Sequence, residues 1–283
     1  MTNGALVLSG GGVAGIAWET AVLLGIQDEQ PATAASILNA PTALVGTSAG
    51  AAVAVQIAAG TPLEQLFAAQ VADETGELFV ELDLAAFGAA MAGAMAGATS
   101  PDEVRRRLGA MAIAADTPST AARRAVIEAR LVVQTWGDRN LRLTAVDAET
   151  GELRVFDRDS GVGLVDAVMA SCAVPGIWPV VEIDGHRYMD GGMRSGSNAD
   201  LAAGADPVLI ITPSTEQTPM GPAVPPSELD ALAPGRVHVV YADAASIASF
   251  GSNPLDPASR KPAALAGRVL GRSVAAEIAA FWN

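Results

Sequence analysis

The residue with the clearest chemical setting is Ser48, which stands in the run Gly46-Thr47-Ser48-Ala49-Gly50. The apolar residues Ala43–Val45 before this run are typical of a buried strand, and Ala49–Ala59 after it are typical of an alanine-rich helix. A strand that turns directly into a helix needs a tight backbone, and small neighbours let a serine project from that turn. The hydroxyl would lie at a helix N-terminus, which favours developing negative charge. Although G-x-S-x-G also arises by chance in glycine-rich chains, the strand-then-helix context predicts a nucleophile at Ser48.

The first glycine-rich segment, Gly10–Gly15, has a similar setting. Ala5–Ser9 before it has the apolar composition of a strand, and Ile16–Gln27 after it has the spacing of a helix. In an open parallel sheet, the loops that follow successive strands reach the same carboxyl edge. Because glycines leave backbone N–H groups unhindered, we expect the segment to supply an oxyanion hole beside Ser48. The residues assigned to this hole are Gly10, Gly11 and Gly12.

The same glycine spacing also matches a dinucleotide-binding loop. Such a loop needs an acidic residue about twenty positions further on, which binds the ribose hydroxyls. No acidic residue occurs between Glu29 and Glu64, and the second strand leads to Ser48 instead. The sequence therefore argues against a nucleotide, and we expect no cofactor.

The composition excludes several classes of protein. The chain has 283 residues, is 50% hydrophobic and contains only 4% aromatic residues. Its alanine and glycine content indicates closely packed helices, and its length allows a sizeable core. A net charge of −14 argues against a nucleic-acid partner and against a broad contact with an anionic membrane. The one lysine, Lys261, lies in a loop-like region, which argues against Schiff-base chemistry or a phosphate-loop lysine.

Cysteine content and apolar runs bear on metal sites and location. The single cysteine, Cys172, excludes an intrachain disulfide and a cysteine-based zinc site, and we expect a small buried side chain there and no metal. No basic segment precedes the first strand, so we expect a cytoplasmic protein, with transient contact at membrane surfaces as a further option. The apolar run Leu84–Ala98 is shorter than a membrane span and is expected to form a packed or interfacial helix.

The rest of the chain is expected to alternate helices, strands and loops. Further helices are predicted at Thr61–Gln70, Asp83–Ala98, Pro101–Ala114, Ser119–Ala129, Leu164–Ser171 and Ala263–Trp282. Further strands are predicted at Leu131–Trp136, Leu141–Asp147, Glu152–Phe156, Pro179–Ile183, Arg187–Met189, Val208–Thr212 and Val237–Tyr241. A turn at Glu149–Gly151 is expected to join Leu141–Asp147 to Glu152–Phe156. A second turn at Asp184–His186 is expected to join Pro179–Ile183 to Arg187–Met189. Surface loops are predicted at Pro213–Gly235, near the mouth of the site, and at Asn253–Pro262.

Positive charge concentrates in the middle of an otherwise acidic chain. We expect a solvated helix surface there, with contact to anionic head groups as the alternative. The residues concerned are Arg105, Arg106, Arg107, Arg123, Arg124 and Arg130.

Two histidines and one aspartate-glycine turn complete the candidate groups. Asp190 is followed by Gly191 and Gly192, and this pattern alone is most typical of an ordinary turn. His186 lies in a turn near Asp190, and His238 lies within an apolar strand, where a histidine is more often structural.

The order of four motifs, SGGGVAG, GTSAG, ASCAVP and DGG, resembles the patatin-like phospholipases, which are lipid acyl hydrolases. The motifs extend from Gly10 to Gly192. The resemblance implies a three-layer α/β/α fold with a mostly parallel central sheet, in a single domain over residues 1–283. It implies a Ser-Asp dyad of Ser48 and Asp190, with the glycine loop as oxyanion hole. One departure is Ala14, where the family usually has Arg or Lys.

The implied activity is hydrolysis of lipid esters through an acyl-enzyme. Asp190 would accept the Ser48 proton, and burial would raise its pKa and make it a better base. Gly15 and Ala49 are expected to contact the substrate, a lipid or fatty-acyl ester; the oligomeric state is left open. Two alternatives stay open: a Ser-His-Asp esterase that uses His238, and an acyltransferase or a non-catalytic lipid-binding module on the same scaffold.

Overall fold

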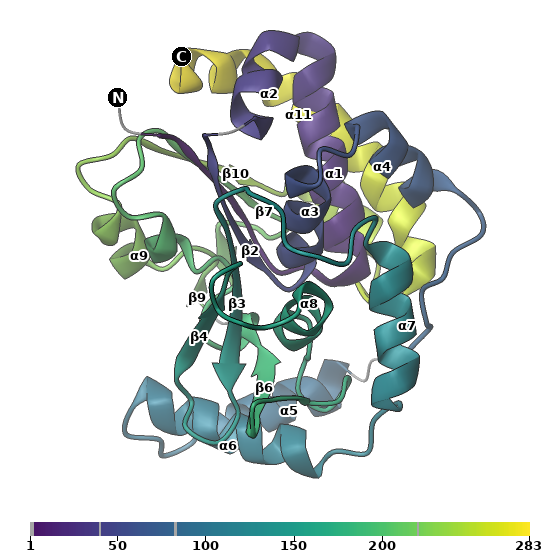
Figure 1. Ribbon diagram of the computed structural model, residues 1–283, viewed down its shortest axis with the longest axis vertical. Helices are drawn as coiled ribbons and strands as arrows, with labels where there is room; N and C mark the ends of the chain where they lie inside the picture. Colours follow the sequence, from purple (N-terminus) through teal and green to yellow (C-terminus); the bar gives the residue numbers. More distant parts are fainter. Residues whose placement is uncertain (1–2, 40, 82–83, 220) are drawn as a thin grey trace.

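The computed structural model describes residues 3–39, 41–81, 84–219 and 221–283, and its central feature is a mixed β-sheet (Figure 1). Its parallel strands, in spatial order, are β10 (Val237–Tyr241), β7 (Val208–Thr212), β1 (Ala5–Leu8), β2 (Ala43–Thr47) and β3 (Leu141–Asp147). Because β1 lies in the middle with β2 beside it, the loops that follow these two strands leave the sheet at the same edge.

Beyond β3 the sheet becomes antiparallel. β4 (Leu153–Phe156) and β6 (His186–Asp190) both pair with β3, and β5 (Val181–Ile183) pairs with β6. The two pairs β3–β4 and β5–β6 are hairpins, because their strands are antiparallel neighbours joined by short turns. The antiparallel part brings Asp190, the last residue of β6, beside the parallel strands.

Alternating side chains of the central strands pack on both faces of the sheet. In β1, Leu6 and Leu8 belong to the larger core, whereas Ala5 and Val7 belong to the smaller one. The larger core is covered by α1 (Gly12–Glu29), α3 (Ala49–Ala58), α8 (Leu164–Ser171) and α11 (Arg260–Trp282). The smaller core is covered by α9 (Pro226–Ala231) and a short 3-10 turn at Ala199–Ala202, on the opposite side in Figure 1. The fold is therefore a three-layer α/β/α arrangement with a mostly parallel central sheet.

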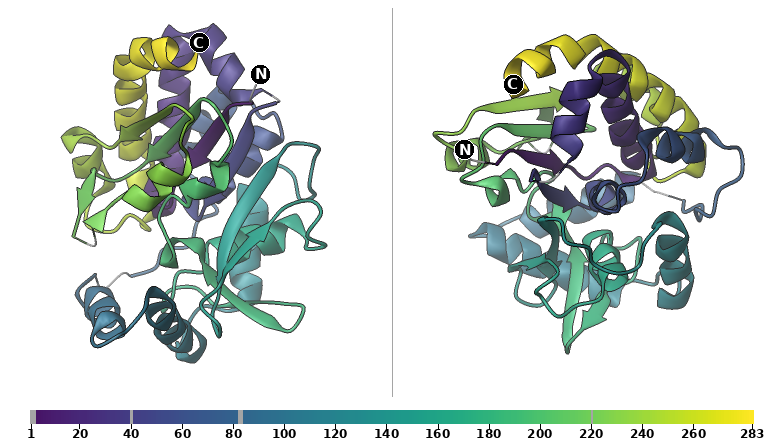
Figure 2. Two further views of the ribbon diagram at one scale, coloured as in Figure 1. Left: turned by 90° about the vertical axis from the view of Figure 1, so that its left-hand side faces the viewer. Right: turned by 45° about the horizontal axis from the view of Figure 1, so that its top comes forward.

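Glycines hold the two longest helices together. α1 and α11 make the most extensive contact between any two elements of the described chain, and they run side by side in Figures 1 and 2. A Cβ atom at Gly271 would overlap the Val22 carbonyl, and one at Gly267 would lie 2.6 Å from the Trp18 carbonyl oxygen. The alanine- and glycine-rich composition thus produces close helix packing, as predicted.

Two helices cover the antiparallel end of the sheet. α5 (Leu84–Met95) and α6 (Pro101–Ala114) lie beneath it in Figure 1, and their side chains form a separate apolar cluster with Val146 and Met189. α7 (Thr120–Arg130) packs on α8. The remaining helices are α2 (Pro31–Leu38), α4 (Leu63–Val71) and α10 (Ala244–Phe250).

Most of the predicted elements are confirmed, but the strand predicted at Leu131–Trp136 is wrong. Leu131 ends α7, and the residues after it are irregular, with the Trp136 indole donating to the Val162 carbonyl oxygen at 2.7 Å. The place beside β2 that this strand would need is occupied by β3. Within this run Leu131 is buried but Val132 is 51% exposed, so its apolar composition here indicates neither a strand nor a continuously buried segment.

Other differences concern loops and helix ends. The predicted loop Pro213–Gly235 contains α9 and a two-stranded ribbon of β8 (Gln217–Thr218) and β9 (Gly221–Pro222). The predicted loop Asn253–Pro262 contains a 3-10 turn at Pro257–Ser259, and α11 begins already at Arg260. Helices α2 and α10 were not predicted, and the predicted start of α5 at Asp83 lies outside the described residues.

Candidate active site

Ser48 lies at a sharp turn between β2 and α3. Its backbone has φ 54° and ψ −113°, a conformation that L-residues rarely adopt and that marks a strained turn. The turn is feasible because its neighbours are small: a Cβ atom at Gly50 would overlap the Leu8 carbonyl. The side chain of Ser48 therefore projects from the end of β2 at the start of a helix, as the G-x-S-x-G spacing predicts.

The hydroxyl of Ser48 donates a hydrogen bond to Asp190. The distance from Ser48 Oγ to Asp190 Oδ2 is 2.7 Å. Strand register explains this meeting: Thr47 is opposite Thr144 on β3, and Asp190 is opposite the next residue, Ala145. The ends of β2 and β6 thus meet along one edge of β3, because β4 occupies its opposite edge.

Asp190 is held in a nearly closed environment. It is 2% exposed, its Oδ1 accepts from the Gly192 N–H at 2.7 Å, and its own N–H donates to the Ala173 carbonyl oxygen at 2.9 Å. Burial raises its pKa to about 6, although the hydrogen bonds from Ser48 and Gly192 and the charge of Arg123 oppose this rise. Above that pH, Asp190 is a carboxylate that can accept the proton of Ser48.

Side chains from the ASCAVP segment fix the backbone of Ser48. Ser171 Oγ accepts the Ser48 N–H at 2.9 Å, and Cys172 Sγ donates to the Ser48 carbonyl oxygen at 3.1 Å. Burial raises the pKa of Cys172 to about 11, so the sulfur remains a thiol that can donate. Cys172 is buried, as predicted, but its contact with the nucleophile, and that of Ser171, could not be read from composition or spacing.

A further polar residue, Asn198, ties the parts of the site together. Its Nδ2 donates to Thr47 Oγ1 at 3.1 Å and to the Ser195 carbonyl oxygen at 2.7 Å, and lies 3.3 Å from the Gly191 carbonyl oxygen. Asn198 is completely buried and thereby links the end of β2 to the turn that follows Asp190. Nothing in the local sequence distinguishes it from a surface asparagine.

The glycine loop is shorter than expected, because α1 begins at Gly12. Gly12 has φ +65°, and a Cβ atom there would lie 2.8 Å from the Pro254 carbonyl oxygen. The N–H of Gly10 donates to the Gly196 carbonyl oxygen at 2.9 Å, so it is engaged within the protein. Within the described chain, the N–H groups of Gly11 and Gly12 have no acceptor, which leaves them free for a ligand.

The two residues expected to contact substrate have different settings. Ala49 lines a small cavity beside Ser48, described below. Gly15 is buried behind the loop, where an added Cβ would lie 3.2 Å from Ala49 Cβ, and it is not among the described residues that line either cavity. Gly15 thus allows α1 and α3 to approach each other.

Neither histidine contacts Ser48 in the described structure. His186 Nδ1 lies 3.0 Å from Asp147 Oδ2, and its side chain is 58% exposed. His238 lies near α11, with its Nδ1 3.9 Å from Glu277 Oε1 and its ring 5.3 Å from that of Phe281. The contacts of both rings are with residues outside the site.

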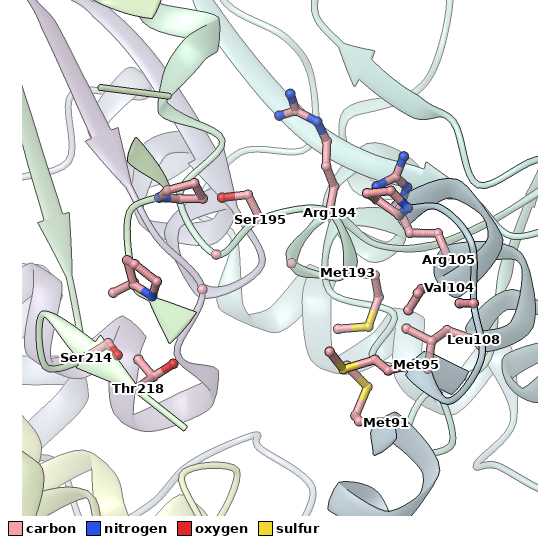
Figure 3. Close-up of a pocket in the computed structure, with 18 of the residues that line it drawn as sticks. Met91, Met95, Val104, Arg105, Leu108, Met193, Arg194, Ser195, Ser214 and Thr218 are labelled. Atoms are coloured by element: carbon pink, nitrogen blue, oxygen red, sulfur yellow. The ribbon is translucent and has the colours of Figure 1, made fainter. Parts of the chain in front are cut away.

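Described residues line a large cleft and a small cavity next to the site. A cleft of about 800 Å³ reaches it at Gly10 and Gly192 (Figure 3). Figure 3 shows Met91, Met95 and Met193 gathered on one side of this cleft, and Ser214 and Thr218 on the opposite side. A second cavity, of about 20 Å³, lies directly beside Ser48; its lining includes Gly12, Ala49, Arg123 and Trp178.

The six arginines of the middle of the chain do not form one solvated helix surface, so that prediction from the sequence is wrong. Arg123 is 4% exposed and its guanidinium carbon lies 3.8 Å from the centre of the Trp178 ring. The side chain of Arg130 is 6% exposed and pairs with Glu77 at 2.7 Å. Ion pairs to acidic side chains are made by Arg105, Arg107 and Arg124, and Arg106 is exposed.

Comparison with known proteins identifies the family. The sequence profile described as Patatin-like phospholipase matches residues 6–203, which is more than half of the chain. The chain therefore belongs to the patatin-like phospholipase family. A comparison with curated protein sequences gave no match.

Comparison with solved structures gave matches to VipD from Legionella pneumophila and to the type III effector protein ExoU. VipD has 13% identity and a TM-score of 0.44, over 96% of this chain and 67% of VipD. ExoU has 15% identity and a TM-score of 0.44, over 98% of this chain and 53% of ExoU. This chain thus spans about half to two thirds of these larger proteins.

Among the described residues, no helix is both long and apolar enough to cross a membrane.

Proposed function

We propose that this protein hydrolyses carboxylic esters of lipids with Ser48 as nucleophile and Asp190 as general base. The observation that carries the proposal is the 2.7 Å hydrogen bond between Ser48 Oγ and Asp190 Oδ2 in a buried setting. The family membership supports lipid ester hydrolysis in general. The contacts of His186 and His238 with residues outside the site give no support to a Ser-His-Asp triad.

The reaction has two halves. In the first, Ser48 Oγ bonds to the ester carbonyl carbon, its proton passes to Asp190, and the carbonyl π electrons move to the oxygen. The N–H groups of Gly11 and Gly12 stabilise this oxyanion. When the oxyanion collapses, the alcohol leaves with the proton from Asp190, and the acyl group remains on Ser48. In the second half, water attacks the acyl-enzyme, Asp190 accepts a proton from it, and the acid leaves as the proton returns to Ser48.

The large cleft supports an amphiphilic substrate. Its apolar side consists of methionines with Val104 and Leu108, and flexible thioether side chains adapt to an apolar ligand of variable shape. Its polar side carries hydroxyl groups, and Arg105 and Arg194 lie at its edge. Because the cleft reaches Gly10 and Gly192, an acyl chain bound along the methionines can present its ester to Ser48.

The first prediction is that Ser48 reacts covalently and is required for hydrolysis. Incubation with a fluorophosphonate probe should give one phosphonylated peptide containing Ser48, identified by mass spectrometry. Ser48→Ala should abolish both labelling and release of fatty acid from phospholipid vesicles, because alanine removes the attacking oxygen. Ser273→Ala, which changes an exposed serine on α11, is the matched control and should behave like the wild type. Retained turnover in Ser48→Ala, with unchanged circular dichroism, would contradict the proposal.

A further inference from the structure

The small cavity beside Ser48 has the size of a single oxygen atom. Its volume of about 20 Å³ is little more than the roughly 10–15 Å³ that one water molecule needs. It is too small for a phosphate group or for an acyl chain, which the cleft of about 800 Å³ can accept. The cavity can therefore hold one small substrate atom, such as an oxygen bonded to the carbon that Ser48 attacks.

Three backbone N–H groups belong to residues that line this cavity. Gly12 and Val13 begin α1, and Ala49 begins α3. In the described chain these three N–H groups have no acceptor, whereas the next donors are satisfied: Ala14 donates to Pro254 and Gly50 donates to Ser9. Residues with unpaired N–H groups at two helix N-termini therefore line one cavity beside the nucleophile, which is a favourable setting for negative charge.

A buried cation lines the same cavity. Arg123, on α7, is 4% exposed, and its Nε and Nη1 have no hydrogen-bond partner among the described residues. Unpaired buried donors of a charged group are costly, so a ligand that accepts from them would recover this free energy. Stacking on Trp178 fixes the plane of the guanidinium group.

The neighbouring charges leave Arg123 available. Glu77 is occupied by Arg130, which donates to both of its carboxylate oxygens at 2.9 and 2.7 Å. Burial lowers the pKa of Arg123 to about 10, so the group remains a cation at neutral pH. Arg123 interacts electrostatically with Asp190 but has no hydrogen bond to it in the described structure.

We propose that this cavity receives the substrate carbonyl oxygen, and that Arg123 is a catalytic residue that donates to the oxyanion together with the N–H groups of Gly12, Val13 and Ala49. The inference rests on the proposed function and deepens its oxyanion hole: it keeps Gly12 as a donor and assigns Val13, Ala49 and Arg123 in place of Gly11, which does not line the cavity. As Ser48 attacks, the proton moves to Asp190 and the negative charge moves from Asp190 to the carbonyl oxygen. The total charge of the site is unchanged, but the charge now lies where Arg123 can bond to it directly. The stabilisation is therefore greater in the transition state than in the resting enzyme.

The second prediction tests this role with substitutions of Arg123. Arg123→Met preserves an unbranched chain over Trp178 but removes the charge, and it should lower kcat by about 100-fold to 1,000-fold with little change in KM. The rate of Ser48 labelling by the fluorophosphonate probe should fall in parallel, because the phosphoryl oxygen also gains charge during attack. Arg123→Lys keeps the charge and should retain more activity than Arg123→Met. Arg124→Met changes the adjacent residue, which pairs with Asp166 outside the site, and should react like the wild type.

Inhibitor binding distinguishes a catalytic role of Arg123 from a purely structural one. A trifluoromethyl ketone with an acyl-like chain adds to Ser48 and places a charged oxygen in the cavity, so Arg123→Met should weaken it by the same factor as kcat/KM. The corresponding ether, which cannot add to serine, should bind equally to both proteins. Equal losses for both inhibitors, or no loss for either, would overturn the assignment of Arg123. If Arg123→Met does not fold, Arg123→Lys and Arg123→Gln provide the same comparison.

The two proposals fail in different ways. If the wild type neither hydrolyses esters nor labels at Ser48, the proposed function fails and the role of Arg123 fails with it. If the wild type reacts and folded Arg123→Met reacts at the same rate, only the role of Arg123 is contradicted.

Discussion

At the scale of single residues, catalysis depends on the protonation of Asp190. Its pKa is raised from 3.8 to about 6, mainly by burial. A base must be deprotonated to accept the Ser48 proton, so the third prediction is that kcat/KM rises as the pH increases through about 6 and then levels off. A pH profile measured with one short-chain ester checks this, and an activity already constant from pH 4 would contradict it.

Substitution separates this carboxylate from the histidines. Asp190→Asn should remove nearly all activity, because an amide cannot accept the proton. The double change of His186 and His238 to Gln should retain most of the activity and the same pH profile, because both rings contact residues outside the site. A triad would instead lose several orders of magnitude with one histidine.

The residues of the site differ in how far sequence could predict them. Ser48 could be found because its turn needs small neighbours at fixed spacing, which the sequence displays. Asp190 was found only through the order of the family motifs, because an Asp-Gly-Gly turn by itself is common. Arg123 was misplaced, since a charged residue on a helix looks the same in sequence whether it is solvated or buried against an aromatic ring.

At the scale of elements, the site is built from the N-termini of α1 and α3. The fourth prediction concerns Gly12, whose φ of +65° and close approach to the Pro254 carbonyl leave no space for a side chain. Gly12→Ala should shift the start of α1, misdirect its N–H groups and lower kcat by at least about 10-fold with KM less affected.

Gly60 provides the matched control for Gly12. It has φ +72°, but a Cβ atom there would meet nothing within 4 Å. Gly60→Ala therefore carries the conformational strain alone and should cost about 1 kcal/mol of stability without a change in kcat. Equal kcat values for the two variants would show that the start of α1 does not position donors for the reaction.

Element boundaries show where local sequence stops being sufficient. The strands and helices around Ser48 are short apolar or alanine-rich runs bounded by glycines, and they were predicted within a few residues. The strand predicted at Leu131–Trp136 was wrong: Leu131 is buried as the C-cap of α7, Val132 is exposed, and Trp136 donates to the Val162 carbonyl, a contact that depends on tertiary structure. Gly12 was assigned to a loop because glycine is unfavourable inside helices. In the structure it is the first residue of α1, and this position leaves its N–H group free to donate to a ligand.

At the scale of the whole molecule, the layered fold followed from alternating strands and helices together with the family resemblance. The order of the strands could not be predicted in this way, since the antiparallel placement of β6 beside β3 depends on contacts across residues 145–190. That placement brings Asp190 to Ser48. The fold thus combines a predictable parallel sheet with an antiparallel extension that completes the site.

The pH dependence of the free energy of unfolding should reflect a second buried carboxyl group, that of Glu19 on α1. It is 0% exposed, its Oε1 accepts the Ser9 N–H at 2.8 Å, and its Oε2 has no partner in the described structure. Burial raises its pKa well above the ordinary value. Because the folded state holds this proton more tightly than the unfolded chain, Glu19 contributes stability below about pH 4.3, and this contribution is lost as the pH rises toward the folded pKa.

The fifth prediction is that Glu19→Gln makes the free energy of unfolding less dependent on pH. Within the window between the unfolded and folded pKa values, the wild type should lose about 1.4 kcal/mol per pH unit relative to the variant, since an amide does not titrate. Urea unfolding followed by circular dichroism at pH 5, 6, 7 and 8 gives both curves, and their difference removes the contribution of Asp190, which both proteins share. Glu29→Gln, at an exposed position on the same helix, is the matched control and should follow the wild type. Parallel curves for Glu19→Gln and the wild type would mean that Glu19 is ionised and compensated inside the fold, contrary to its burial, with no cationic partner among the described residues.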